Sequence, residues 1–382
     1  MRLLFFNYEF PPLGGGGANA NAYLFREFAK DASLVVDCVT SAWGAADETV
    51  ALSPNITLHR LAVGKRARHF WTQREVLTYL ARAHVKAGEL MAENAYDLCH
   101  AFFGFPSGLP AWLRRERLPY LISLRGSDVP GFNPRFTFQY VLLKPLFRRI
   151  WGKARFVVAN SVGLRALARA FAPELPMEVI PNGIDTAEFF PAAASASAPT
   201  RLLCVSRLVA RKGVRHLIEA LPAVLAAVPE ATLTLIGEGD LTESLKQRCV
   251  ELKIDDRVRF AGYVPHEELP ECYRRADLFV LPSYYEGMSN TMLEAMASGL
   301  PIVATGEGGR EELLRDNALT VPFGAPRPLA EGIVALLGDP ERLAAMGRRS
   351  REIASEFSWA AVAGRYLELY RAMATPRRIG EG

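Results

Sequence analysis

Residues 201–221 read "RLLCVSRLVARKGVRHLIEAL", and this stretch decides the fold. Its first part, 201–207, is a short apolar run that predicts a buried strand. A basic loop follows, and Gly213 opens a stretch with the apolar spacing of an amphipathic helix. A strand, a loop and a helix in this order predict a βαβ unit, from which parallel sheets are built.

The same alternation of short apolar runs and amphipathic stretches extends along the chain. The first series of predicted strands lies at 2–7, 34–39, 97–101, 119–124, 155–159 and 177–181. The second series lies at 201–207, 231–237, 257–263, 277–283, 301–305 and 318–323. Between the two series stands "PAAASASAPT" (191–200), whose small and polar residues predict a linker.

The length of 382 residues fits two domains better than one core. We therefore predict an α/β protein with two Rossmann-like, doubly wound domains at 1–190 and 191–357. Ligands of such sheets bind outside the carboxyl ends of the strands, so two such domains are expected to face each other across a ligand cleft. A last helix, within 358–382, is expected to cross back to the first domain.

Composition and charge set the expected location and partners. Five cysteines are scattered singly and predict neither a disulfide framework nor a zinc site. The start "MRLLFFNYEF" is too short for a signal sequence and no apolar run is long enough to span a membrane, so we expect a cytoplasmic protein. Residues 1–190 carry 22 Lys and Arg against 16 Asp and Glu. That basic balance suits peripheral contact with an anionic inner membrane face, or a phosphorylated acceptor, although solvated faces also explain it. No nucleic acid partner is expected.

A glycine run follows the first predicted strand, in "PPLGGGGANANAYLFREF" (11–28). Consecutive glycines let the backbone approach a ligand closely, and the free N–H groups at the start of the following helix suit a phosphate. A structural turn explains the run equally well. Asp37, near the end of the second strand, keeps a dinucleotide site open and with it an oxidoreductase as an alternative.

Two cations stand at the end of the strand with which the second domain begins. Arg207 leaves the strand, and Lys212 lies just before Gly213. Such a pair at a helix start predicts a diphosphate site, because Arg supplies a planar fork and Lys a point charge.

Two carboxylates stand eight residues apart in "SYYEGMSNTMLEAMASGLPIVAT" (283–305). Glu286 is on the predicted loop, Ser289 is the predicted N-cap of a helix, and Glu294 lies in the first two turns of that helix. Carboxylates so placed accept hydrogen bonds from neutral hydroxyls, and the helix start between them suits phosphate. A nucleoside diphosphate sugar would satisfy all these groups.

Four segments in order carry a family resemblance. "EGMSNTMLE" (286–294) resembles the E-x7-E signature of retaining GT-B glycosyltransferases, in particular glycosyltransferase family 4, the glycosyl transferases group 1. The other three segments resemble the family's glycine loop, its Arg and Lys pair, and its interdomain segment: "PPLGGGG" (11–17), "RLVARKG" (207–213) and "IPNGID" (180–185). The resemblance covers most of the chain and implies the two-domain GT-B fold.

The resemblance also implies roles for these residues. Glu286 would contact the donor sugar, Glu294 the nucleotide ribose, and Arg207 with Lys212 the diphosphate. Other donor contacts would come from backbone groups of the signature loop and the glycine loop: Met288, Ser289, Asn290, Gly15, Gly16 and Gly17. The cations would replace the divalent metal of other transferases, so no metal and no cofactor is expected.

Three polar residues of the first domain are further candidates. His100, in "DLCHAFFGF" (97–105), matches the family's strand-end histidine and would touch the donor sugar or the acceptor. Arg125 stands where the family often has His, and it is a candidate for holding phosphate or acceptor charge. Asp128 is a candidate polar residue of the cleft. A structural role stays open for two of them, since strand-end histidines are often satisfied inside the fold and acids are common in turns.

The resulting prediction is a metal-independent, retaining hexosyltransferase. It would move a sugar from a nucleoside diphosphate sugar to a glycan or lipid-linked acceptor in cell-surface polysaccharide or lipopolysaccharide synthesis. A front-face attack is favoured, because the implied place of Glu286 on the sugar hydroxyls does not suit a nucleophile. The alternatives are a GT-B nucleotide-sugar epimerase, which needs an acid and a base flanking the sugar, and a non-catalytic GT-B scaffold.

Overall fold

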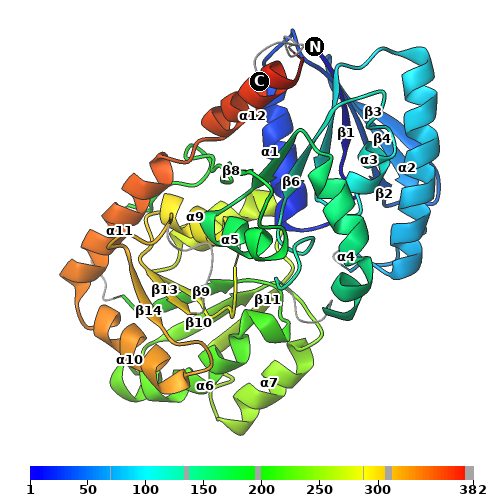
Figure 1. Ribbon diagram of the computed structural model, residues 1–382. Helices are drawn as coiled ribbons and strands as arrows, with labels where there is room; N and C mark the ends of the chain where they lie inside the picture. The colour runs from blue at the N-terminus through cyan, green and yellow to red at the C-terminus, as the bar shows by residue number, and fades with distance from the viewer. Residues whose placement is uncertain (69, 133–136, 194–198, 287, 306–311, 375–382) are drawn as a thin grey trace. The chain divides into compact units, whose positions relative to one another are not determined.

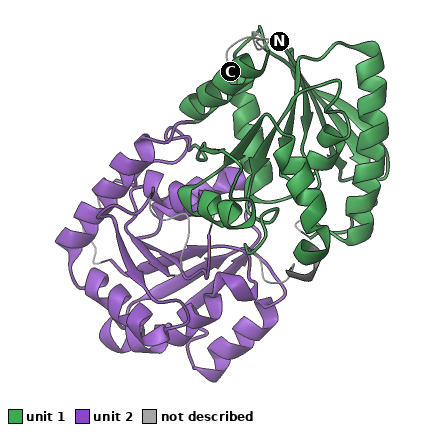
Figure 2. Cartoon of the chain, viewed as in Figure 1, with its two compact units in different colours: residues 1–183, 359–382 green, residues 184–358 purple. Residues whose placement is uncertain are grey.

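A computed structural model describes the chain except residues 69, 133–136, 194–198, 287, 306–311 and 375–382. The chain divides into two compact units (Figure 2). Unit 1 comprises Met1–Gly183 and Trp359–Gly382, and unit 2 comprises Ile184–Ser358. Each unit is built on its own mostly parallel sheet, so the prediction of two α/β, Rossmann-like units is confirmed.

Unit 1 has the strand order β3-β4-β2-β1-β5-β6-β7-β8 (Figure 1). Its strands are β1 (Arg2–Phe6), β2 (Val35–Ala42), β3 (Glu48–Ser53), β4 (Ile56–Ala62), β5 (Leu98–Phe102), β6 (Tyr120–Leu124), β7 (Phe156–Ala159) and β8 (Met177–Val179). Its helices are α1 (Gly16–Phe28), α2 (Gln73–Glu93), α3 (Gly108–Trp112), α4 (Thr137–Gly152), α5 (Val162–Phe171) and α12 (Trp359–Ala374). The strand order runs one way from β1 and the other way from β5, so the loops after these two strands open at the switch point, where ligands of such sheets bind.

Unit 2 has the strand order β11-β10-β9-β12-β13-β14. Its strands are β9 (Arg201–Val205), β10 (Thr232–Ile236), β11 (Val258–Gly262), β12 (Leu278–Leu281), β13 (Ile302–Thr305) and β14 (Ala318–Val321). Its helices are η2 (Ala210–Lys212), α6 (Val214–Ala227), α7 (Thr242–Glu251), η3 (His266–Glu268), α8 (Leu269–Arg274), α9 (Asn290–Ala297), α10 (Pro326–Leu337) and α11 (Pro340–Ser355). One core cluster holds α6, α7 and α10 against the sheet, and the other holds α8 and α9, so the sheet is covered on both faces.

Strands were predicted where β1, β2 and β5 to β14 lie, but β3 and β4 were missed. β4 pairs parallel with β2 and antiparallel with β3. β3 is an edge strand, and five of its six residues are exposed, so it carries no buried apolar run for a prediction to detect. β4 alternates polar and apolar residues, whereas the other strands were predicted from continuous apolar runs.

The segment 184–190 was assigned to the first domain, but it lies in unit 2. Ile184 and Phe189 are buried in the unit 2 core, and Asp185 accepts the backbone N–H groups of Ala187 and Glu188 at 2.9 and 3.2 Å. This capped turn therefore packs with the strands that follow it.

Helix α12 belongs to unit 1, where it packs on α1. The rings of Tyr23 and Trp359 stack at a centroid distance of 5.4 Å, and Phe28 meets Tyr370 edge-on at 5.9 Å. The last helix of the chain thus completes the core of the unit that contains the first strand. Among the helices in the described part of the chain, none has both the length and the apolar character needed to cross a bilayer.

Candidate functional site

The strongest candidate site lies at the switch point of unit 2, where β9 and β12 are neighbours. The loop after β9 carries the basic residues of η2, and the loop after β12 leads into α9. Carboxyl ends of adjacent parallel strands lie at one edge of the sheet, so these two loops meet. The backbone N–H of Tyr284 donates to the carbonyl of Arg211 at 2.9 Å, which ties the loops together.

Lys212 and Glu286 form an ion pair between these loops. The Lys212 Nζ donates to Glu286 Oε1, and each side chain is 13% exposed. Gly213 follows with φ +64°, and a Cβ there would lie 2.0 Å from the Pro282 carbonyl oxygen. Only glycine allows this close approach, which holds Lys212 against the β12 loop. The structure thus brings together two of the predicted site residues.

Burial and charge act together on this pair. Burial lowers the pKa of the Lys212 ammonium; the Glu286 carboxylate opposes this effect, while the Arg211 and Arg207 cations add to it. Burial would raise the pKa of the Glu286 carboxyl, but Lys212 and Arg211 outweigh it and the pKa is lowered. Glu286 therefore stays ionised at neutral pH. Arg207 itself is exposed near the start of the loop after β9, and Arg211 is a third cation that was not among the predicted site residues.

The start of α9 completes this loop cluster. Ser289 is the N-cap, as predicted, and its Oγ accepts the backbone N–H of Met292 at 3.3 Å. Met288 and Ser289 are buried and Asn290 is the first helical residue. Uncapped N–H groups at a helix start favour anions. Gly287 lies outside the described residues.

Glu294, in the second turn of α9, is held at both carboxylate oxygens. The Tyr273 hydroxyl donates to Oε2 at 2.8 Å, and His266 Nε2 lies 3.2 Å from Oε1. Glu294 is only 5% exposed. Neither Tyr273 nor His266 was predicted, because they come from α8 and from η3, which follows β11, and only the folded sheet brings these elements to α9.

Two glycines after β10, Gly237 and Gly239, were not among the predicted site residues. A Cβ at Gly237 would lie 2.1 Å from the Ser206 carbonyl oxygen, and one at Gly239 would lie 2.1 Å from that of Leu208. The loop after β10 therefore packs directly on the loop that presents Arg207. The motif "IGEGD" (236–240) was the available signal, since glycines after a strand often mark close backbone approach.

The glycines of the unit 1 loop have two kinds of surroundings. A Cβ at Gly14 would lie 2.7 Å from Glu9 Cδ, and one at Gly17 would lie 2.6 Å from the Phe103 ring. These two positions are therefore small for packing reasons. A Cβ at Gly15 would meet nothing within 4 Å, and Gly15 and Gly16 are exposed. Backbone approach by a ligand is possible at Gly15 and Gly16, not at the packed Gly14.

Glu9 is a buried carboxylate that was not predicted as a site residue. It is 7% exposed and lies against Gly14 and Gly17, in the loop after β1. Burial lowers the pKa of Lys65 and of Arg125, and the Glu9 charge is one of the effects that oppose this lowering. The signal in the sequence was an acid shortly after the first strand, next to the glycine run.

His100 lies in the interior of unit 1. It is the third residue of β5, not a residue beyond the strand end, and it is fully buried. Its Nδ1 lies 2.6 Å from the Tyr370 hydroxyl and its Nε2 lies 2.7 Å from Ser123 Oγ. Burial and the Arg125 cation lower the pKa of His100 well below its ordinary value. Both ring nitrogens are thus used to connect β5, β6 and α12.

Arg125 and Asp128 lie close together after β6, and both make hydrogen bonds within unit 1. Asp128 accepts the backbone N–H groups of Gly104, Arg125 and Gly126 at 2.6 to 2.9 Å, and it is 3% exposed. The Arg125 guanidinium donates to Asn182 Oδ1 at 2.5 Å and lies 4.1 Å above the Phe102 ring. Asp128 has the contacts of a turn acid, whereas Arg125 is a partly exposed cation.

Asp37 has the contacts of a structural residue. It lies in the first half of β2 and accepts hydrogen bonds from Arg2 at 2.8 Å, from Tyr96 at 2.9 Å and from His59 at 3.1 Å. Arg2 begins β1, so this cluster is near the amino ends of the strands. A dinucleotide site requires its acid at the carboxyl end of the second strand, and Asp37 is not there.

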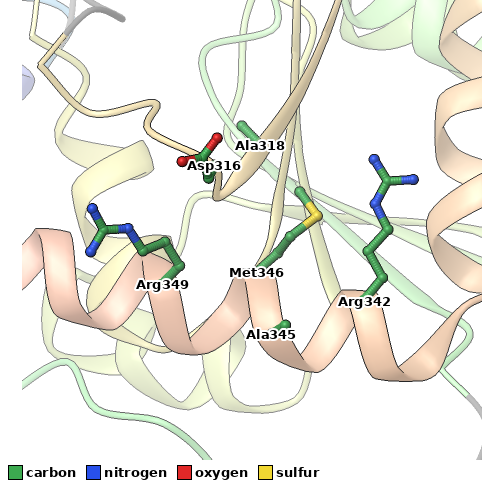
Figure 3. Close-up of a pocket in the computed structure, with 6 residues that line it drawn as sticks. All are labelled: Asp316, Ala318, Arg342, Ala345, Met346 and Arg349. Atoms are coloured by element: carbon green, nitrogen blue, oxygen red, sulfur yellow. The ribbon is translucent and has the colours of Figure 1, made fainter.

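A groove of about 510 Å³ lies elsewhere on unit 2 (Figure 3). It is lined by Asp316 and Ala318, before and at the start of β14, and by Arg342, Ala345, Met346 and Arg349 of α11. Asp316 precedes its strand, so the groove belongs to the amino ends of the sheet. It is therefore separate from the loops that carry Lys212 and Glu286.

Comparisons with known proteins give the family. Residues 14–188 match the model "Glycosyltransferase Family 4", and residues 185–353 match "Glycosyl transferases group 1". The chain is 30% identical over 312 residues to a GDP-mannose-dependent alpha-(1-6)-phosphatidylinositol monomannoside mannosyltransferase of Mycobacterium tuberculosis, which covers 75% of this chain and 79% of that relative. It is 31% identical over 335 residues to a D-inositol 3-phosphate glycosyltransferase of Kineococcus radiotolerans, covering 76% and 75%.

A solved structure agrees with these matches. A sucrose-phosphate synthase from Thermosynechococcus elongatus superposes with a TM-score of 0.82 at 25% identity, over 98% of this chain and 99% of that one. The chain belongs to the family 4, group 1 glycosyltransferases, whose fold is GT-B, and it is a glycosyltransferase.

Proposed function

We propose that the chain transfers a sugar, with retention and without a metal, from a nucleoside diphosphate sugar to a lipid-linked or glycan acceptor. The observation that carries the proposal is the largely buried Lys212–Glu286 pair at the switch point of unit 2. The names of the relatives support the substrate class, since one is GDP-mannose-dependent and acts on a phosphatidylinositol mannoside.

The cations near the α9 start would bind the diphosphate. The Lys212 ammonium has three N–H donors, and its bond to Glu286 uses one of them. Arg207 is exposed and offers a planar fork, and Arg211 adds a third positive charge. These groups would neutralise the charge that develops on the departing diphosphate, which is the contribution a metal makes in other transferases.

The transfer would proceed as a front-face displacement. An acceptor hydroxyl forms the new bond to the anomeric carbon, the bond from that carbon to the β-phosphate oxygen breaks, and that phosphate oxygen takes the hydroxyl proton. Glu286 would accept hydrogen bonds from the donor sugar hydroxyls. Its ion pair with Lys212 stabilises the carboxylate and makes it a poor nucleophile, which disfavours a covalent intermediate.

Contributions from unit 1 are also proposed. Gly15 and Gly16, exposed at the start of α1, would approach a substrate phosphate, and Arg125 would hold acceptor charge. We do not assign a catalytic role to His100 or a ligand to Asp128, because their polar atoms make hydrogen bonds to other groups of unit 1.

Peripheral contact of α4 with an anionic membrane is a further part of the proposal. Val141 and Leu142 are 70% and 68% exposed, and Lys144 and Arg149 on the same helix are cations. Apolar residues beside cations suit an interfacial helix. Sedimentation with phosphatidylglycerol vesicles is expected to fall for Val141→Ser/Leu142→Ser. Equal sedimentation of variant and wild type would contradict the contact.

The test of the transferase is slow donor hydrolysis in the presence of EDTA. GDP-, UDP- and ADP-sugars are screened with wild type and with Glu286→Gln. One donor should be hydrolysed without metal, and the variant should lose this activity. Hydrolysis that requires added metal would overturn metal independence. If no donor is hydrolysed or bound, the pocket is not a donor site, and a non-catalytic scaffold becomes the better interpretation.

A further inference from the structure

The Glu294 carboxylate is fixed from two sides by residues of two other elements. Tyr273 of α8 donates to Oε2 at 2.8 Å, and His266 of η3 holds Oε1 at 3.2 Å. Because a carboxylate only accepts, His266 Nε2 must carry the proton of its bond. Among the described residues, each Glu294 oxygen thus accepts one side-chain hydrogen bond, from Tyr273 or from His266. A carboxylate oxygen can accept a second hydrogen bond.

Phe189 holds both partner rings in place. Its ring meets His266 edge-on at 5.6 Å and Tyr273 edge-on at 5.9 Å. Phe189 is fully buried, and its carbonyl accepts Arg351 Nη1 at 2.7 Å. Packing from a third segment thus fixes the directions of the imidazole and the phenol.

The two donors differ in their surroundings. Tyr273 is fully buried, and burial together with the Glu294 carboxylate raises the pKa of its hydroxyl well above the ordinary value, so the hydroxyl remains a donor. His266 is partly exposed, with 24% of its side chain accessible, and Nδ1 lies 3.8 Å from Glu188 Oε1. Of the two partners of Glu294, His266 is therefore the one that solvent reaches.

We propose that Tyr273 and His266 are positioning residues that orient Glu294 to accept the two neighbouring hydroxyls of the nucleotide ribose. This inference rests on the proposed function and on the contact between Glu294 and the nucleotide ribose that the family resemblance implies. Each carboxylate oxygen already accepts one hydrogen bond and has a second lone pair. The two remaining lone pairs can accept hydrogen bonds from two adjacent hydroxyl groups. The arrangement therefore selects a ribonucleotide donor over a deoxyribonucleotide one.

The test compares nucleoside diphosphates that differ only in the ribose. The full-length chain is titrated calorimetrically with the ribonucleoside diphosphate that the donor screen selects among GDP, UDP and ADP, and with its 2′,3′-dideoxy analogue. Variants are Tyr273→Phe, His266→Ala, His266→Gln and Glu294→Gln. Tyr370→Phe is the matched control, since it removes another buried tyrosine hydroxyl, in unit 1.

Tyr273→Phe and His266→Ala are each expected to weaken ribonucleotide binding about tenfold and dideoxy binding little, as for loss of a hydrogen bond to a charged group. His266→Gln keeps an N–H donor and should recover most of the loss, and Tyr370→Phe should bind like wild type. The positioning role would be overturned if Tyr273→Phe and His266→Ala weakened the binding of both nucleotides equally, or of neither. This conclusion requires that Glu294→Gln weakens ribonucleotide binding more than dideoxynucleotide binding. If Glu294→Gln itself leaves ribonucleotide affinity unchanged, the proposed ribose contact fails instead.

Discussion

Both switch points of this molecule carry polar residues, but the two units use them differently. In unit 2, the charged groups of Lys212 and Glu286 face each other across two loops and remain partly accessible. In unit 1, both nitrogens of His100 and both oxygens of Asp128 bind groups of the same unit. A polar residue near a strand end is therefore not by itself a site residue.

What distinguishes the two regions is the source of the partners. The unit 2 pair consists of opposite charges from adjacent loops, and Lys212 keeps donors beyond the one that Glu286 uses. The unit 1 groups bind backbone amides and hydroxyls of the unit itself, and the bonds of His100 connect β5, β6 and α12. The first arrangement can exchange a partner for a ligand, whereas the second would lose internal hydrogen bonds.

The largest expected effect is on turnover after removal of the Lys212 side chain from the unit 2 pair. Lys212→Ala should lower kcat/KM for the donor about 10² to 10³-fold, since it removes a preorganised cation from the departing diphosphate. Arg215→Ala is the matched control: it removes an exposed cation, paired with Glu219 four residues on, and should leave kcat/KM within about twofold. Steady-state transfer assays measure both, and equal losses in the two variants would contradict the assignment.

The next effect compares two glycines. Gly213→Ala should destabilise the protein by about 3 kcal/mol, because φ is +64° and the new Cβ would meet the Pro282 carbonyl at 2.0 Å. Gly15→Ala has open space around its Cβ and should change stability by less than about 0.5 kcal/mol. Urea denaturation measures both changes. If Gly15 approaches a substrate phosphate, its variant should raise KM while its stability stays close to that of wild type.

A smaller effect separates structure from catalysis at His100. His100→Asn should destabilise unit 1 by about 2 kcal/mol, because the Tyr370 and Ser123 hydroxyls lose a buried partner. The folded variant, assayed well below its Tm, should keep kcat/KM within about threefold of wild type. A loss of kcat about 10²-fold at unchanged fold, judged by circular dichroism, would return His100 to the catalytic residues.

The fold could be predicted from local patterns, whereas the site could be predicted only in part. Apolar runs identify most of the buried strands, but β3 has no buried apolar run and was missed. Glu286, Lys212 and the Ser289 cap stand in short motifs whose elements are adjacent in the sequence. Tyr273 and His266 reach Glu294 from distant elements, so no local spacing indicates them.

A sequence also does not show which polar groups have hydrogen-bond partners in the fold. The string "DLCHAFFGF" does not reveal that Tyr370, 270 residues later, occupies His100 Nδ1. The same limit applies to Asp37, whose position in the sequence was compatible with the acidic residue of a dinucleotide-binding site. Only the folded sheet shows that its partners Arg2, His59 and Tyr96 surround it.

Asp37 supplies the smallest predicted effect, on the pH dependence of stability. Burial, which raises the pKa of a carboxyl, is outweighed at Asp37 by hydrogen bonds from His59, Arg2 and Tyr96, so its pKa is lowered. The unfolded chain therefore binds the proton more readily, and the stabilisation by Asp37 is complete above about pH 4 and is lost as the pH falls through the lowered value. Urea titrations should show Asp37→Asn less stable than wild type by about 1 kcal/mol or more near pH 7, with the gap narrowing below about pH 4.

The control for this prediction is Asp47→Asn, whose partner pair with Arg82 is largely exposed and should contribute little at any pH. A gap between wild type and Asp37→Asn that stays constant into acid would mean that the charge of Asp37 is not what stabilises unit 1. Donor turnover near neutral pH should be the same for wild type and Asp37→Asn, because Asp37 lies near the amino ends of the strands. An activity loss in the folded variant would instead place a substrate contact at that end of the sheet, and the distinction between a saturated unit 1 cluster and an exchangeable unit 2 pair would no longer hold.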